Sequence, residues 1–208
     1  MKLADSFKVF SFNTWILPFY PFLMLSIRYW RKKAIGMLNF KPGDKVIIPG
    51  VGSGHDIPFI PKDVKVEGVD ITDAMLGIAK AKLKVYRRQD SVTLRKMDAE
   101  KLDYPDNTFD KAILSLFLSV VYNPEKAFNE AVRVVKPGGE ILIYDHLLRR
   151  GTVPKFFAKA VDVVLQFSFA SVTRIYDDIA ENQPVELVKV ISGDPIGFVK
   201  GFLLKKKK

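Results

Sequence analysis

The sequence contains no cysteine and only two histidines, His55 and His146. The absence of cysteine excludes disulfides, thiolate metal ligands and cysteine nucleophiles, and it fits a reducing compartment such as the cytoplasm. Two histidines are too few for a histidine-rich site, so we expect no bound metal. A long apolar run is also missing. The stretch from Trp15 to Ile27 is shorter than the ~20 residues of a spanning helix, and two prolines interrupt it.

Acidic residues are fewer than basic ones, with 23 Asp and Glu against 33 Lys and Arg, which gives a net charge of +10. Such an excess fits simple solubility, a nucleic-acid partner or an anionic membrane surface. Part of the charge is clustered. Arg31, Lys32 and Lys33 follow an aromatic segment, and residues 205–208 form a lysine tail, for which a frayed, solubilising end and an artificial addition are the two interpretations.

From Lys45 onward, short apolar runs alternate with helical patterns. The runs predict five strands, over 45–49, 64–70, 92–97, 109–115 and 140–145. Helices are expected between them: a short one after the first strand, one over 74–88 and one over 124–135. Alternating strands and helices predict an α/β fold with a mostly parallel sheet covered on both faces.

No composition shift divides the chain, so residues 1–208 are expected to form one domain. Residues 1–40 are expected to be helical and rich in aromatic side chains. A further helix is predicted over 153–175, where the apolar surface is too broad for one buried stripe. That helix would line an acyl groove or fill the core. Two last strands are expected over 185–191 and 197–204.

The most informative motif is the glycine loop Gly50-Val51-Gly52-Ser53-Gly54, which directly follows the first predicted strand. Glycines at this place permit a tight turn and let a ligand approach the backbone. A dinucleotide fingerprint does not fit, because its third glycine would fall on His55. A phosphate-binding loop is excluded as well, since no Gly-Lys-Ser/Thr follows.

Two acidic residues follow the next two predicted strands. Asp70 ends the second strand, where an acidic side chain can accept hydrogen bonds from both ribose hydroxyls of a nucleoside. Asp98 follows the third strand and can accept from an adenine amino group, while Ala99 offers a backbone N–H. The alternatives are an exposed carboxylate at Asp70 and a helix or turn cap at Asp98.

In order and spacing, these segments within residues 42–146 resemble the motif series of class I S-adenosylmethionine (SAM) dependent methyltransferases. The resemblance implies a Rossmann-like, seven-stranded sheet with an antiparallel last strand, and SAM as cofactor. One departure is Ile48, which stands where such enzymes usually carry an acidic residue that helps to hold the cofactor's amino group. Carried over to this sequence, the expected cofactor contacts are Gly50, Val51, Gly52, Ser53, Gly54, Asp70, Ile71, Met75, Asp98, Ala99, Ser115 and Phe117.

Three shorter segments are similar to bacterial phosphatidylethanolamine N-methyltransferases: residues 50–61, Asp145-His146 and residues 193–198. This similarity implies a phospholipid headgroup amine, or another small amine, as methyl acceptor. His146 would orient the amine or take its proton, and aromatic faces at Tyr20, Tyr144 or Phe117 would stabilise the cationic product. His55 is expected to cap or line the cofactor pocket.

The aromatic N-terminal segment precedes the basic triplet Arg31-Lys32-Lys33, a combination typical of proteins that touch anionic bilayers. We therefore expect a cytoplasmic protein that is peripheral on the inner face of the membrane. The alternative for residues 1–40 is an ordinary helical lid over the cofactor, and the two roles are compatible.

Three other functions stay open. A quinone-ring or small-molecule methyltransferase would carry the same cofactor motifs. A nucleic-acid methyltransferase is disfavoured, because the Asn/Asp-Pro-Pro-Tyr/Phe motif of the amino-methylating enzymes is replaced by residues 115–118, Ser-Leu-Phe-Leu. A non-catalytic membrane-surface protein would retain the fold. The oligomeric state is not indicated by the sequence.

Overall fold

The computed structural model describes residues 20–147, 174–193 and 199–208, and it describes side chains from residue 27 onward. Most of the helix predicted over 153–175, together with Trp15 and residues 194–198, therefore lies outside the described residues. No helix in the described part of the chain has the length and apolar character needed to cross a bilayer.

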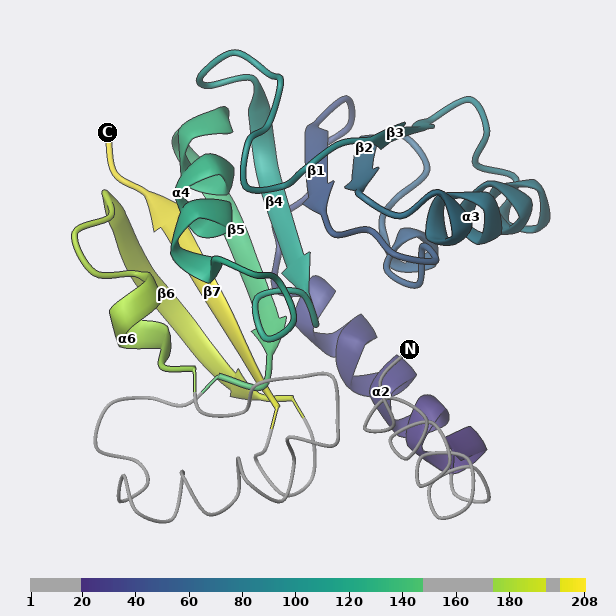
Figure 1. The fold of residues 1–208 in the computed structure, drawn as a ribbon, viewed down its shortest axis with the longest axis horizontal. Helices are drawn as coiled ribbons and strands as arrows, with labels where there is room; N and C mark the ends of the chain where they lie inside the picture. The colour runs from purple at the N-terminus through teal and green to yellow at the C-terminus, as the bar shows by residue number, and fades with distance from the viewer. Residues whose placement is uncertain (1–19, 148–173, 194–198) are drawn as a thin grey trace, which may run out of the picture.

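The described strands form one seven-stranded sheet in the order β3-β2-β1-β4-β5-β7-β6 (Figure 1). Strands β1 to β5 are parallel, whereas β7 runs antiparallel to both β5 and β6. The predicted mostly parallel sheet with an antiparallel last strand is thus confirmed. The strand bounds are β1 Lys45–Pro49, β2 Lys65–Asp70, β3 Val92–Lys96, β4 Phe109–Ser115, β5 Val135–Asp145, β6 Val185–Ser192 and β7 Lys200–Lys206.

Alternate residues of the central strands enter two separate cores, one on each face of the sheet. In β1, Ile47 belongs to one core, whereas Val46 and Ile48 belong to the other; in β4, Leu114 and Ile113 divide in the same way. Because both faces are covered, these strands are apolar along nearly their whole length. This is why short apolar runs predicted them correctly.

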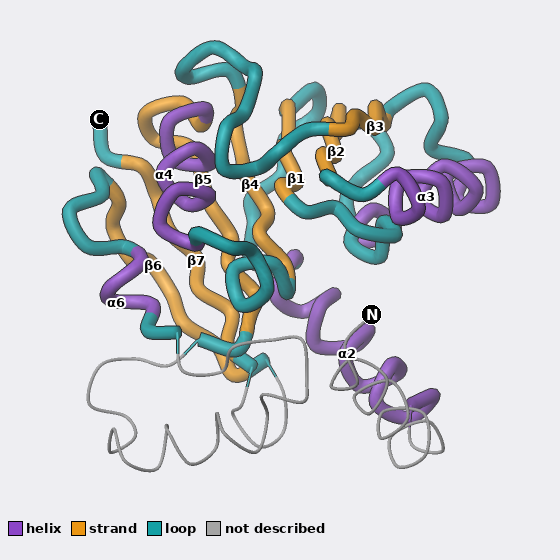
Figure 2. Tube along the Cα trace, viewed as in Figure 1, coloured by secondary structure: helices purple, strands orange, loops and turns teal. Residues whose placement is uncertain are grey.

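Helices cover both faces (Figures 1 and 2). On one side, α4 (Pro124–Val134) and the short α6 (Tyr176–Ile179) contribute buried side chains such as Phe128 and Tyr176. On the other side lie α2 (Tyr20–Ile35), the 3-10 turn η3 (Ile57–Phe59) and α3 (Asp73–Tyr86). The start of α4 is fixed by its first residues, because Asn123 Oδ1 accepts from the Lys126 amide at 2.9 Å and Pro124 follows the cap.

Two boundaries differ from the sequence prediction. The sequence prediction left residues 136–139 between a helix over 124–135 and a strand over 140–145. In the structure, β5 already begins at Val135 and shifts its register on β4 after the Phe109–Val135 pair. A side chain at Gly139 would lie 2.6 Å from the Asp110 carbonyl oxygen, so this irregular part of the strand needs glycine.

The lysine tail is also better ordered than predicted, because Lys205 and Lys206 continue β7. The ammonium group of Lys206 donates to the Val135 carbonyl at 2.7 Å and to Asn107 Oδ1 at 3.0 Å. These lysines are therefore part of the sheet and not a frayed end.

Candidate cofactor and active site

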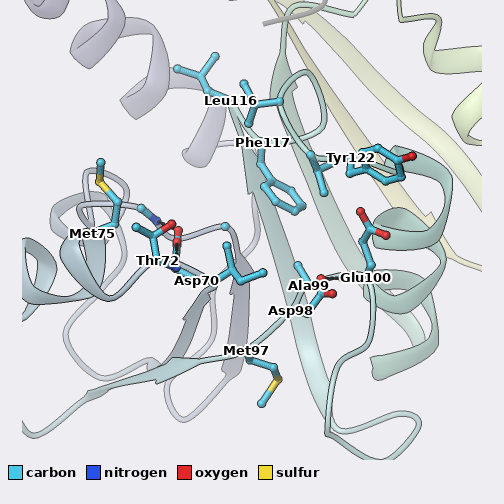
Figure 3. A pocket seen from close by; sticks show the side chains of 15 residues that line it. Asp70, Thr72, Met75, Met97, Asp98, Ala99, Glu100, Leu116, Phe117 and Tyr122 are labelled. Atoms are coloured by element: carbon cyan, nitrogen blue, oxygen red, sulfur yellow. Dashed lines mark hydrogen bonds between the residues drawn. The ribbon is translucent and has the colours of Figure 1, made fainter. Parts of the chain in front are cut away.

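A cavity of about 590 Å³ lies at the carboxyl ends of β1, β2, β3 and β4 (Figure 3). Strand β1 occupies the place in the sheet where the strand order reverses, since β2 and β3 lie on one side and β4 on the other. Open α/β sheets bind their ligands at such a switch point. The cavity is lined by Gly50, Gly52, Asp70, Ile71, Thr72, Met75, Met97, Asp98, Ala99, Glu100, Leu116, Phe117, Val120, Val121 and Tyr122.

The glycine loop forms one wall, and its three glycines are all in the left-handed region, with φ of 66°, 52° and 75° for Gly50, Gly52 and Gly54. Residues other than glycine rarely adopt this conformation. At Gly50 there is also no space for a side chain, because an added Cβ would lie 2.1 Å from Cδ2 of Phe117. Glycine here lets the Phe117 ring approach the loop that borders the cavity.

Asp70 connects the glycine loop to the end of β2. Its Oδ2 accepts from the Gly52 amide and its Oδ1 accepts from the Thr72 amide, each at 2.9 Å. Each carboxylate oxygen has a further lone pair, so Asp70 keeps acceptor capacity toward a ligand in the cavity. The same carboxylate can therefore hold the loop and contact a ribose.

On the opposite side of the cavity, Asp98, Ala99 and Glu100 follow β3. Asp98 Oδ1 accepts from the Glu100 amide at 2.8 Å, which is the turn-capping contact considered as an alternative from the sequence. Glu100 in turn accepts from the Asn123 amide at 2.7 Å and so ties this turn to the start of α4. The cap leaves Oδ2 of Asp98 without a hydrogen bond that the described residues supply, on an exposed side chain at the cavity.

The mouth of the cavity is apolar and exposed on both sides. Met75 lies beside Asp70, and Tyr122, 94% exposed, lies across the cavity from them (Figure 3). Ile71, 66% exposed, and Val120 also line the cavity. Exposed apolar side chains around a cavity indicate a ligand that covers them. An adenosine group and an apolar or amphipathic acceptor both have this character.

The loop over residues 116–122 carries local backbone strain. Leu116, directly after β4, has φ of 52°, although it is not glycine, and its amide donates to the Tyr144 carbonyl at 2.7 Å. Such conformations concentrate at functional sites. The loop is held further by the Ser119 amide, which donates to the buried carboxylate of Asp145 at 3.0 Å.

Asp145 and His146 lie together at the carboxyl end of β5. Asp145 is 0% exposed, and its Oδ1 accepts from the His146 amide at 2.7 Å and lies 3.5 Å from His146 Nδ1. The Arg174 guanidinium donates to the Leu118 carbonyl; burial lowers the pKa of Arg174, against the nearby carboxylates of Glu125 and Asp145, which raise it. Asp145 thus connects His146 to the 116–122 loop.

The structure separates the expected cofactor contacts into two groups. Eight of them line the cavity: Gly50, Gly52, Asp70, Ile71, Met75, Asp98, Ala99 and Phe117. The other four, Val51, Ser53, Gly54 and Ser115, do not line it. Val51 is buried against Gly68, Gly54 packs on Ile57 and Ala79, and the Ser115 hydroxyl is buried with no partner among the described residues.

Three further predicted residues are His55, Tyr144 and Tyr20. His55 does not line the cavity as described; its ring lies 3.2 Å from the Lys82 ammonium on α3, and its expected place at the cofactor pocket stays a prediction. Tyr144 is buried in the core, where its hydroxyl donates to the Gly193 carbonyl at 3.0 Å. Tyr20 begins α2, but its side chain lies outside the described ones. The roles of Tyr20 and Tyr144 toward a product stay predictions.

Seven residues of the lining were not singled out from the sequence: Thr72, Met97, Glu100, Leu116, Val120, Val121 and Tyr122. Met97 and Leu116 directly follow β3 and β4, so their position after a parallel strand was a usable signal. Nothing in the residue types of the 116–122 loop distinguished Val120, Val121 or Tyr122 from an ordinary apolar loop.

Comparisons with known proteins agree with this geometry. Residues 48–143 match the family described as methyltransferase domain. The chain is 36% identical over 119 residues to a phosphatidylethanolamine N-methyltransferase from Cereibacter sphaeroides, an alignment that covers 57% of this chain and 58% of that protein. It is 31% identical over 160 residues to a ubiquinone/menaquinone biosynthesis C-methyltransferase from Hydrogenovibrio crunogenus, covering 75% of this chain and 61% of that protein. The chain thus spans less than two thirds of the length of both relatives.

Among solved structures, a geranyl diphosphate C-methyltransferase from Streptomyces coelicolor A3(2), in complex with S-adenosyl-L-homocysteine, superposes with a TM-score of 0.71. The identity is 12%, and the match covers 85% of this chain and 74% of that one. The fold is therefore the Rossmann-like methyltransferase fold that the sequence predicted. Residues 48–143 thus match a methyltransferase domain, and both relatives are methyltransferases by name.

Proposed function

We propose that this chain is a SAM-dependent methyltransferase that methylates the headgroup amine of a phospholipid. The proposal depends on one observation. Asp70 accepts a hydrogen bond from the amide of Gly52 in the glycine loop, and both residues border a cavity that has Asp98 on its other side. Two observations support a phospholipid amine as the methyl acceptor. They are the similarity to a phosphatidylethanolamine N-methyltransferase, and the short sequence similarities within 50–61 and at Asp145-His146.

The residues present suit SAM. Gly50 and Gly52 leave the loop backbone open to an amino-acid moiety, Asp70 has acceptor capacity for ribose hydroxyls, and Asp98 can accept from an adenine amino group. Ile71 and Met75 offer apolar contacts for the adenine ring. Ile48, which replaces the usual acidic residue, is fully buried, so any contact with the cofactor's amino group must come from other residues.

When bound, SAM supplies an activated methyl group, and the protein's own task is to position the acceptor, exclude water and accept a proton. An amine can attack only when it is unprotonated. We assign proton acceptance or orientation of the amine to His146, which Asp145 connects to the 116–122 loop at the cavity. The exposed ring of Tyr122 at the mouth is an additional aromatic face for a methylated, cationic headgroup.

We further propose that the protein acts as a peripheral protein at the inner membrane surface, where such lipids reside. In the structure, the predicted basic triplet divides into one paired, mostly buried side chain and two exposed ones. Arg31 pairs with the buried Asp56 at 2.9 Å and its side chain is only 12% exposed, so it is a structural residue. Lys32 and Lys33 are exposed, and so are Arg28 and Tyr29 on the same helix. A lid role for residues 1–40 stays a prediction, because residues 1–19 lie outside the described chain.

A quinone-ring methyltransferase is the second candidate, favoured by the similarity to the ubiquinone/menaquinone enzyme over 75% of this chain. Transfer of radiolabelled methyl groups from SAM to a lipid extract, and in parallel to demethylated quinones, distinguishes the two. Labelled mono-, di- or trimethylated ethanolamine lipid is the expected result. Labelled quinone with unlabelled lipid, from a protein that binds SAM in calorimetry, would overturn the phospholipid assignment and leave the cofactor assignment intact.

A further inference from the structure

A second group of polar side chains lies outside the cofactor cavity, on the segment that follows the glycine loop. The ammonium group of Lys82, on α3, lies 3.2 Å from Nε2 of His55 and 3.4 Å from Oγ of Ser53. We call these three residues the Lys82 cluster. None of them lines the cavity, and all three can donate hydrogen bonds at one point of the surface.

Positive charge surrounds the Lys82 cluster. Three cations act on His55, namely Lys82 of α3 and Arg31 and Arg28 of α2, and Asp56 is the carboxylate that acts on it from its own segment. Asp56 is already paired with Arg31 at 2.9 Å and is buried. The cluster therefore carries more positive charge than its neighbours neutralise.

The surrounding cations contribute to a lowered pKa at both titratable side chains of the cluster, His55 and Lys82. Burial, followed by the nearby Lys82 and Arg31, lowers the pKa of His55, and burial followed by Arg31 lowers the pKa of Lys82. In the simplest arrangement, the Lys82 ammonium donates to a neutral His55 ring. An anion bound beside this pair would accept from both side chains and offset the positive charge of Lys82 and the nearby arginines.

The neighbouring helices extend this basic surface. Helix α2 carries four basic residues and no acidic one, and α3 carries three basic residues and only Asp73 as an acidic one. A groove of about 580 Å³ lies on the α2 side, lined by Arg28, Tyr29, Lys32, Pro58 and Phe59. The guanidinium of Arg28 lies 5.2 Å from the centre of the Phe59 ring, and Tyr29 is 62% exposed. The groove thus combines cationic and apolar walls.

We propose that the Lys82 cluster, with Arg28 beside it, binds a phosphate group at a site separate from the cofactor cavity. The ammonium of Lys82, a ring N–H of His55 and the hydroxyl of Ser53 would donate to the phosphate oxygens, and the guanidinium of Arg28 would add a charged donor. The phosphate belongs to a lipid headgroup or is a free ion. The proposal does not depend on the methyl acceptor or on methyl transfer.

The two histidines make the site accessible to proton NMR, because the protein has only two imidazole C2–H signals. The variant His146→Gln assigns the His55 signal. Inorganic phosphate and a soluble short-chain phosphatidylglycerol are titrated separately, at constant ionic strength maintained with sodium chloride. We expect saturable shifts of the His55 signal with both ligands, and a rise of its pKa by about one unit at saturation, because an anion favours the protonated ring.

The phosphodiester is the sharper probe of the pH dependence, because its charge does not change between pH 5 and 8, whereas inorganic phosphate titrates there. Protonation of His55 adds a donor and a positive charge, so phosphatidylglycerol should bind more tightly as the pH falls through the His55 pKa. Tighter binding of the lipid than of inorganic phosphate identifies a headgroup site that uses the groove. Equal affinities identify a site for the free ion.

The variant Lys82→Gln should weaken binding of both ligands by about tenfold, the effect of losing one charge-assisted hydrogen bond. Lys80→Gln is the matched control, since Lys80 is an exposed lysine on the same helix that lies outside the cluster. It should change affinity by less than about twofold. His55→Asn is a second test that keeps the lysine. Shifts that do not saturate, or equal losses from Lys82→Gln and Lys80→Gln, would show general charge screening and overturn the site.

Discussion

The carboxylate of Asp70 accepts a hydrogen bond from the backbone amide of Gly52, 18 residues earlier in the chain, at 2.9 Å. This bond fixes the middle of the glycine loop to the end of β2. A residue expected from the sequence to bind a ribose is therefore also a support for the loop that borders the cavity. Substitution of Asp70 should affect both the shape of the loop and the affinity for SAM.

Asp70→Ala is expected to weaken SAM binding by at least about tenfold, because it removes two hydrogen bonds from backbone amides and the acceptors for the ribose. Isothermal titration calorimetry measures the dissociation constant. Asp73→Ala is the control, since Asp73 is an exposed carboxylate three residues later that pairs with Lys96. Near-normal affinity of the Asp70 variant would contradict the assigned role.

Gly50→Ala is expected to lower the melting temperature and abolish SAM binding, because the new Cβ would overlap the Phe117 ring and the residue has φ of 66°. Gly77→Ala is the matched control. Gly77 lies in α3 with no heavy atom within 4 Å of an added Cβ, so this change should raise stability by about 0.5–1 kcal/mol. Equal effects of the two changes in calorimetry would contradict the close approach at Gly50.

Protonation of Glu130 is expected to make the protein less stable in acid. The hydrogen bond from Arg133 and that from the Leu102 amide lower its pKa, against burial, which raises it. A depressed folded-state pKa contributes stability that is complete above about pH 5 and is lost as the pH falls through the ordinary value of ~4.3 toward the folded value.

Urea unfolding between pH 7 and pH 3 measures this contribution. Glu130→Gln should lower the free energy of unfolding at pH 7 by about 1–3 kcal/mol and flatten its decline toward pH 3. Glu186→Gln, at an exposed position on β6, should leave the wild-type pH dependence in place. An unchanged slope in the Glu130 variant would argue against this electrostatic role.

His146→Gln is expected to lower the rate of methyl transfer by about a hundredfold if the histidine accepts a proton from the amine. The SAM dissociation constant should stay within about twofold of the wild type, because His146 does not line the cavity. The pH–rate profile separates this role from a structural one, since loss of a proton acceptor changes the shape of the profile, whereas a structural change lowers the rate alike at every pH. A parallel profile at a lower rate would identify His146 as a positioning residue.

The double variant Lys32→Gln/Lys33→Gln is expected to weaken binding to vesicles that contain phosphatidylserine by about tenfold or more, at ~1 kcal/mol for each basic residue. Vesicle sedimentation gives the partition coefficient. Lys101→Gln/Lys126→Gln is a matched control with two exposed lysines elsewhere on the surface. Arg31→Gln should instead lower stability, because it breaks the pair with buried Asp56. Equal partitioning of the two double variants would remove the membrane role of α2.

The central strands β1 and β4 could be predicted from the sequence because they are buried on both faces and appear as nearly continuous apolar runs. The glycine loop and Asp70 could be recognised because their chemistry depends on residue type and on their place after a strand. His55 could not be placed in this way. Its sequence position next to the loop suggested the cavity, but its ring lies 3.2 Å from the Lys82 ammonium, and contact with a side chain 27 residues later is not specified by any local pattern.

Two further differences have a similar physical cause. Arg31 was grouped with Lys32 and Lys33 because they are adjacent, yet successive residues of a helix point about 100° apart, and Arg31 turns toward Asp56. Asp145 was recognised only as a neighbour of His146. Its bond to the Ser119 amide depends on how the 116–122 loop folds back over β5, which no local pattern in the sequence specifies.

The placement of β7 between β5 and β6 has a consequence for the order of folding (Figure 1). Strand β6 precedes β7 in the chain, but among the described strands it is hydrogen-bonded to β7 alone. The hairpin of β6 and β7 must therefore form and then dock on β5 as a unit, or β7 must dock first and recruit β6. Both routes make closure of this edge a late, long-range event, separate from the local β–α–β assembly around the glycine loop.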